Sequence, residues 1–99
     1  MSYKTLTQIE YNLLNKIARK TKSDCWFSIE QDKNDEDYIH DLKEGKRLSL
    51  DEGVVQLLKA IDCKETYASC DLTSEEENAF KLLIEKLNLG LFYNDTFGG

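Results

Sequence analysis

Three segments of the chain carry apolar side chains at the spacing of an α-helix. The stripes are Ile9, Leu13, Leu14, Ile17 and Ala18; Val54, Leu57, Leu58 and Ile61; and Ala79, Phe80, Leu83, Ile84 and Leu87. This periodicity predicts helices over about residues 8–20, 50–61 and 74–89, each with its stripe turned toward a shared core.

The pattern Leu-[Ser/Thr]-x-x-Glu opens each of these segments, at residues 6–10, 48–52 and 72–76. In such a capping box the hydroxyl accepts a hydrogen bond from the amide three residues later, and the Glu there accepts one from the cap amide. The three copies therefore predict three helix starts. Gly90 is predicted to end the third helix as a left-handed residue.

Residues 24–50 alternate with the period of β-strands rather than helices. The alternation covers Cys25–Glu30 and Tyr38–Leu42, and the polar stretch 31–37 between them is rich in turn formers. A two-residue turn at Glu44-Gly45 would let residues 46–48 return as a short third strand with a basic edge. A β-hairpin or a three-stranded meander is therefore expected.

The register of this hairpin decides which side chains face the helices. The preferred pairing sets Phe27 near Leu42, and one face then carries Cys25, Phe27, Ile29, Tyr38, His40 and Leu42. Pairing Phe27 with Asp41 instead mixes the two faces and is disfavoured. With Phe27 and Ile29 inside, Trp26 is expected on the outer face beside Ser28 and Ile39.

These elements predict an α+β fold of order α-β-β-(β)-α-α, with three helices packed on one face of the sheet. Residues 1–99 form one domain. Residues 62–71 are expected to be a loop or a short extended piece. Gly53 is less favourable in a helix than alanine, but its lack of a side chain would permit its helix to pack closely on the sheet. An apolar tail from about residue 91 either packs back on the domain or offers a contact surface.

Composition indicates an ordinary globular protein, with 40% hydrophobic and 32% charged residues. Three Cys without framework spacing favour free thiols and a reducing compartment, and no segment reads as a membrane span or signal peptide. We therefore expect a cytoplasmic protein. The net charge of −6 argues against non-specific nucleic-acid binding, although residues 1–23 hold five basic residues against one acid.

No candidate for metal or cofactor chemistry has the spacing that it requires. The acidic stretch 32–37 lacks the Gly and Glu that a calcium loop places at its sixth and twelfth positions. Cys25, Cys63, Cys70 and His40 lack the knuckle spacing of zinc ligands. We expect no metal and no cofactor. Cys25 and His40 on one sheet face would suit a nucleophile and base, but no oxyanion site accompanies them.

Three stretches carry a family resemblance. They read Leu-Thr-x-x-Glu-Tyr-x-Leu-Leu, then Asp-Cys-Trp-Phe, then Asp-Leu-Lys-Glu-Gly-Lys-Arg-Leu-Ser-Leu. In this order the chain resembles small uncharacterised proteins carried by bacterial mobile elements. The resemblance covers most of the chain and implies no activity and no functional residue.

The leading functional hypothesis is a small non-catalytic protein–protein interaction module, with an acidic decoy or regulator of a basic partner as a special case. Its expected contact residues are Trp26, Asp32, Asp35, Glu36, Asp37, Phe92 and Tyr93. The alternative is a nucleic-acid accessory protein that uses Lys16, Arg19, Lys20 and Lys22. The third is a small enzyme that uses Cys25 and His40. We expect a protein partner and no membrane, and a homodimer is left open.

Overall fold

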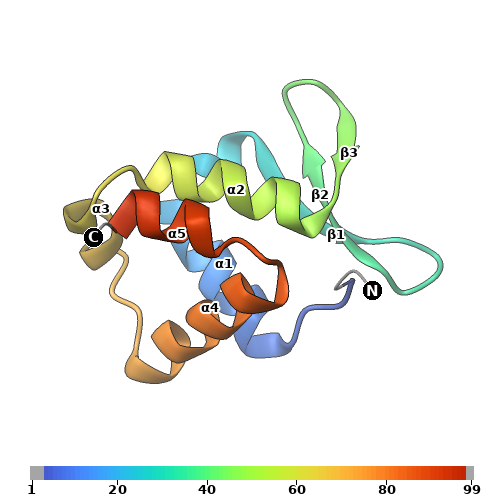
Figure 1. The fold of residues 1–99 in the computed structure, drawn as a ribbon. Coiled ribbons are helices and arrows are strands. Elements are labelled where there is room, and N and C mark those ends of the chain that lie inside the picture. The colour runs from blue at the N-terminus through green and yellow to red at the C-terminus, as the bar shows by residue number, and fades with distance from the viewer. Residues whose placement is uncertain (1–3, 98–99) are drawn as a thin grey trace.

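The computed structural model describes residues 4–97, with the backbone alone for residues 95–97. Within this range the chain is α+β, as predicted, and its antiparallel sheet is the three-stranded alternative (Figure 1). It has five α-helices rather than the expected three. The elements are α1 (Gln8–Lys20), the 3₁₀ turn η1 (Ser23–Cys25), β1 (Phe27–Gln31), β2 (Asp37–Asp41), β3 (Lys46–Leu48), α2 (Leu50–Ile61), α3 (Lys64–Ala68), α4 (Ser74–Lys86) and α5 (Gly90–Phe97). In the described part, no helix is long and apolar enough to cross a bilayer.

All three predicted capping boxes are present, and the helices that follow them begin at the predicted residues. The reciprocal pairs are Thr7 with Glu10, Ser49 with Glu52, and Thr73 with Glu76. These signals are confirmed because each one satisfies helix-end amides within a few residues of sequence.

The predicted end of the third helix is wrong. The helix α4 stops at Lys86, and Asn88 takes the left-handed conformation with φ 57°. The amide of Asn88 donates to the Glu85 carbonyl (3.1 Å), and the amide of Leu89 donates to the Ile84 carbonyl (2.9 Å). These two bonds form a Schellman motif, which frees Gly90 to begin α5. The expected loop over residues 62–71 is also wrong, because it contains α3.

The sheet has the order β1-β2-β3, and its register differs from the preferred prediction. Phe27 pairs with Asp41, so the inner face carries Phe27, Ile29, Ile39 and Leu48. Ile39 is fully buried, whereas Leu42 is 47% exposed in a four-residue loop in place of the expected two-residue turn. Tyr38 and His40 therefore lie on the outer face.

Close packing of α2 on the sheet explains why Ile39 occupies the inner face. Gly53 lies in the first turn of α2, directly over the Ile39 side chain. A Cβ atom at residue 53 would collide with Ile39 Cγ1 and lie 2.8 Å from Ile39 Cβ. The prediction that Gly53 permits a close helix–sheet approach is confirmed.

Helices α1 and α4 are antiparallel, and an ion pair joins the start of each helix to the later part of the other. Lys16 Nζ lies 2.8 Å from Glu76 Oε1, and Lys86 Nζ lies 3.0 Å from Glu10 Oε2. Glu10 is only 2% exposed. Glu10 and Glu76 also complete the capping boxes of α1 and α4, so each carboxylate stabilises a helix start and joins the two helices.

The apolar tail packs back on the domain as α5, which lies along α2 (Figure 1). The Tyr93 ring contacts Phe80 with a centroid distance of 6.2 Å, and Tyr67 of α3 stacks on Phe80 at 5.9 Å. Burial of Tyr67 and Tyr93 raises the pKa of each phenol. Residues 98 and 99 of the predicted tail lie outside the described residues.

Candidate functional site: a groove beside helix α2

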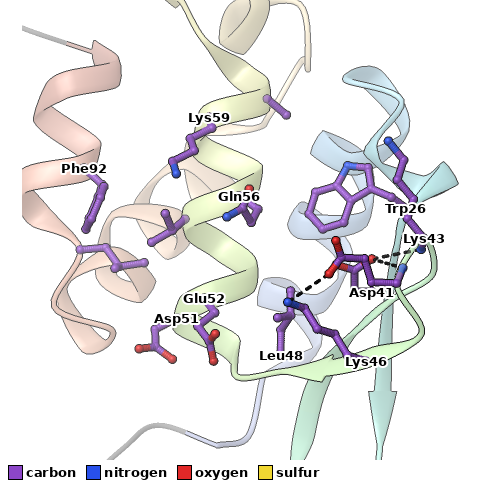
Figure 2. A pocket seen from close by; sticks show the side chains of 14 residues that line it. Trp26, Asp41, Lys43, Lys46, Leu48, Asp51, Glu52, Gln56, Lys59 and Phe92 are labelled. Carbon is purple, nitrogen blue, oxygen red and sulfur yellow. Dashed lines mark hydrogen bonds and ion pairs between the residues drawn. The ribbon is translucent and has the colours of Figure 1, made fainter.

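A groove of about 790 Å³ runs between the β2–β3 loop, α2 and α5 (Figure 2). Its apolar lining includes Trp26, Leu48, Val55, Leu89 and Phe92. These residues come from just before β1, from β3, from α2 and from around the start of α5, so the groove exists only in the folded domain. Its volume lies within the range of roughly 300–1,000 Å³ that small-molecule sites have.

Trp26 enters the groove because the chain turns just before β1. The 3₁₀ turn η1 ends at Cys25, and Trp26 has ψ −4°, outside the extended region. The alternation of β1 therefore does not include Trp26. The Trp26 ring packs edge-on against Phe27 at a centroid distance of 5.5 Å. The expectation of Trp26 on the outer sheet face beside Ile39 is wrong, since Ile39 is on the inner face.

Phe92 lies across α2 from Trp26, in the first turns of α5 (Figure 2). Its side chain remains 45% exposed, whereas the neighbouring Tyr93 turns toward Phe80 and the core. The structure thus brings two of the predicted contact residues, Trp26 and Phe92, into one groove. Tyr93 instead packs α5 against Phe80 of α4.

Opposite charges lie at the two ends of α2 along the groove (Figure 2). Asp51 and Glu52 are in its first turn and Lys59 is in its last turn. Glu44 and Lys46, also on the rim, form an ion pair with each other at 3.2 Å. Along α2, the rim therefore runs from a negative end to a positive end.

The sequence alone did not identify the groove. Val55 gave a weak signal, because it is an apolar residue beside the α2 stripe rather than within it. The contributions of Leu48 and Leu89 depend on the sheet register and on the Schellman motif. Both are decided by contacts distant in sequence.

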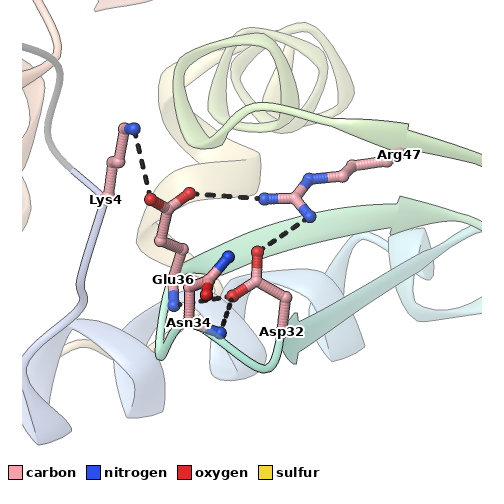
Figure 3. Close-up of polar contacts among 5 residues, drawn as sticks. All are labelled: Lys4, Asp32, Asn34, Glu36 and Arg47. Atoms are coloured by element: carbon pink, nitrogen blue, oxygen red, sulfur yellow. Dashed lines mark hydrogen bonds and ion pairs between the residues drawn. The ribbon is translucent and has the colours of Figure 1, made fainter.

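The acidic turn between β1 and β2 is neutralised by two basic side chains (Figure 3). Arg47 lies 2.9 Å from Asp32 and 3.6 Å from Glu36, and Lys4 lies 3.2 Å from Glu36. Asp32 also accepts hydrogen bonds from the Glu36 and Asn34 amides, and these bonds lower the pKa of its carboxyl.

The remaining two predicted acids of this turn differ from each other. Asp37 accepts a hydrogen bond from the Leu6 amide at 2.7 Å. Asp35 is exposed in a left-handed conformation, with φ 61°, and its carboxylate has no partner among residues 4–97. The turn lies beyond the opposite end of β2 from the groove, so the two sets of predicted contact residues form separate surfaces.

The predicted basic patch at the end of α1 is divided. Lys16 donates to Glu76 and, at 3.2 Å, to the carbonyl of Asp71, so its charge is used inside the domain. Arg19, Lys20 and Lys22 are exposed. Three cations rather than four are available for an external anion.

The Cys25–His40 pair loses its geometric basis. Cys25 lies in η1, where its thiol donates to the Lys22 carbonyl at 2.9 Å. His40 Nδ1 lies 2.6 Å from Glu30 on the outer face of the sheet. The register that placed both residues on one face is wrong.

The other thiols do not assemble with these groups into a metal site. Cys70 is buried, and burial raises the pKa of its thiol. Over the described range, no three His, Cys, Asp or Glu side chains are grouped to hold a metal ion. Comparison of the chain with protein-family models, curated proteins and solved structures finds no match.

Proposed function

We propose that the protein is a non-catalytic protein-interaction module whose contact surface is the groove beside α2. The observation that carries this proposal is that Trp26, just before β1, and Phe92, in α5, line one groove from the two sides of α2. Aromatic side chains around a concave apolar surface are typical of the residues that contribute most to binding. The three cysteines are free thiols, which supports a cytoplasmic location.

The partner that fits this groove best is an amphipathic helical segment. Its apolar face would lie along α2 and contact Trp26 on one side of that helix and Phe92 on the other. A basic residue at one end would face Asp51 and Glu52, and an acidic residue at the other end would face Lys59. This pattern of charges sets the direction in which the segment binds.

The groove is preferred to the acidic turn as the contact surface. A decoy for a basic partner needs unpaired acids, and Lys4 and Arg47 already neutralise Asp32 and Glu36. The acidic turn therefore offers Asp35 as its main open charge.

The nucleic-acid alternative has a direct test. We expect no appreciable binding of DNA or RNA at physiological salt. A sub-micromolar complex that weakens steeply with salt, and that loses affinity in the variants Arg19→Ala and Lys20→Ala, would overturn this ranking. Lys22→Ala extends the same series.

A displayed library of helical peptides tests the groove proposal without a known partner. Selected peptides should carry an apolar helical face between a basic end and an acidic end. In NMR titrations with a selected peptide, the amides around Val55 should shift most. Peptides that shift only residues outside the groove would refute the proposal.

Variants then test the anchors. Phe92→Ala should weaken the selected peptides roughly thirtyfold while the fold persists, because Phe92 is a half-exposed hot-spot aromatic. Leu82→Ala is the matched control, since Leu82 is 55% exposed on α4 and does not line the groove. Equal affinities for the two variants would contradict the proposal. Lys59→Glu should select peptides whose acidic end has become basic.

A further inference from the structure

The outer edge of β1 presents backbone groups that no described residue satisfies. The amide of Leu42 donates to the Trp26 carbonyl, and the amide of Asp32 donates to the Glu36 carbonyl. These two bonds fix the alternation, so Ser28 and Glu30 bond to β2. The N–H and C=O groups of Phe27, Ile29 and Gln31, here called the β1 edge, point away from the sheet. Within residues 4–97 they have no hydrogen-bond partner.

The opposite edge of the sheet is almost closed. The strand β3 has three residues, and its pairing with β2 leaves Arg47 as the one residue whose backbone points outward. Beyond the end of β3, the carbonyl of Lys4 accepts a hydrogen bond from the Asp37 amide at 2.7 Å. The β1 edge has neither a lysine, a proline nor a bulge to protect it.

We propose that a second copy of the chain pairs with the β1 edge, strand against antiparallel strand, to form a dimer with a continuous six-stranded sheet. The two-fold axis passes between the two copies of Ile29. Phe27 then lies opposite Gln31, and Ser28 lies opposite Glu30. All outward groups of both strands are satisfied by about six hydrogen bonds.

The charges of β1 favour this register over its neighbours. Glu30 is the one charged residue of β1, and it lies off the axis so that it meets Ser28 rather than its own copy. Sliding the strands by two residues in one direction would oppose Glu30 with Glu30, which is destabilising. Sliding them in the other direction leaves outward groups unpaired.

The same geometry explains why the assembly closes at two copies. Each dimer uses both β1 edges, and the remaining edges offer little more than the backbone of Arg47. The contact is isologous, so it does not propagate into a fibre. Ile29, partly buried in the monomer, gains the Ile29 of the second copy as a neighbour on the inner face.

The full chain tests this proposal by sedimentation and by NMR hydrogen exchange over a range of concentrations. A concentration-dependent dimer should form, and the amides of Phe27, Ile29 and Gln31 should exchange more slowly as it forms. A monomer at the millimolar concentrations of NMR would overturn the proposal. A dimer whose β1 edge amides still exchange freely would overturn it too, because its interface would lie elsewhere.

Substitutions at Gln31 separate backbone pairing from side-chain effects. Gln31→Pro removes one outward N–H, and proline is tolerated where a strand edge faces solvent. Because the symmetric pair loses this bond twice, dimer affinity should fall roughly tenfold or more. Gln31→Ala keeps the N–H and should dimerise like the parent. Binding of a groove peptide should be the same in both variants, so failure of this proposal is distinguishable from failure of the groove proposal.

Charge at residue 28 tests the register and remains informative if Gln31→Pro fails to fold. Ser28→Lys places a cation opposite Glu30 of the second copy, and Ser28→Glu places an anion there. The two symmetric pairs should make the first dimer roughly tenfold tighter and the second roughly tenfold weaker. Equal dimer affinity for both variants would overturn the register.

Discussion

Replacing Gly53 with alanine should destabilise the protein, although the same change strengthens most helices. Gly53 lies inside α2, where alanine is intrinsically favoured by about 1 kcal/mol. The new Cβ, however, would collide with Ile39 Cγ1 and lie 2.8 Å from Ile39 Cβ and 3.1 Å from Cγ2. Carbon atoms pack at about 3.5–4.0 Å, so α2 or the sheet must move.

The size of the loss follows from how little the site can yield. Ile39 is 0% exposed and sits on the central strand, with neighbours on both sides. Overpacking of a rigid core costs about 1–3 kcal/mol, and the upper part of this range applies here. After the gain in helix propensity, we expect a net loss of about 2 kcal/mol in the free energy of unfolding. For a domain of this size, that loss lowers Tm by about 8–16 °C.

Denaturant unfolding followed by circular dichroism measures this loss. Gly90→Ala is the matched control, because a Cβ there meets nothing within 4 Å, and its stability should be unchanged or slightly raised. In a double-mutant cycle, Ile39→Ala removes the colliding Cγ1 atom, so the two changes should be coupled by about 1 kcal/mol or more. A stabilised Gly53→Ala variant, or strict additivity with Ile39→Ala, would refute the close packing described above.

Three further outcomes are expected. The hydrogen bond from Lys16 holds the pKa of Glu76 below its usual range. This pair therefore stabilises the fold above pH ~4.3, and its contribution is lost as the pH falls through the lowered pKa. Lys16→Ala should remove this pH dependence from an acid unfolding curve. Asn88→Val should cost about 1–2 kcal/mol in denaturant unfolding, because a β-branched residue is strained at φ 57°. Phe27→Ala should cost about 3–5 kcal/mol in thermal melts by leaving a core cavity, and a cost below ~1 kcal/mol would contradict the assigned inner face.

The helix starts could be read from the sequence because their stabilising interactions are local. A capping box joins two residues three apart, and the apolar stripe behind it repeats over a single element. The end of α4 was harder to predict from the sequence. Asn88 and Gly90 both suit a left-handed position, and the choice of Asn88 is decided by Leu89, which is 5% exposed and packs into the core as the motif closes.

The sheet register could not be read from the sequence because the counting of apolar residues favours the wrong face. Tyr38, His40 and Leu42 outnumber Ile39 in that alternation. Burial in β2 is decided instead by one gap, the missing side chain at Gly53, which admits Ile39. Gly53 indicated a close approach of helix and sheet, but the sequence did not identify Ile39 as the strand residue that lies beneath it.

The register also creates the candidate site. Pairing Phe27 with Asp41 makes Leu42 the partner of Trp26, at the point where β1 has already left the extended conformation. Trp26 therefore lies outside the strand, and the alternation of β1 does not decide which way its ring points. The ring lines the groove between the β2–β3 loop and α2. Leu48, which pairs with Ile39, lines the same space. The side of the groove formed by Trp26 and Leu48 thus depends on the Gly53–Ile39 contact, so a change that shifts this contact should alter peptide binding even though Gly53 lines no part of the groove.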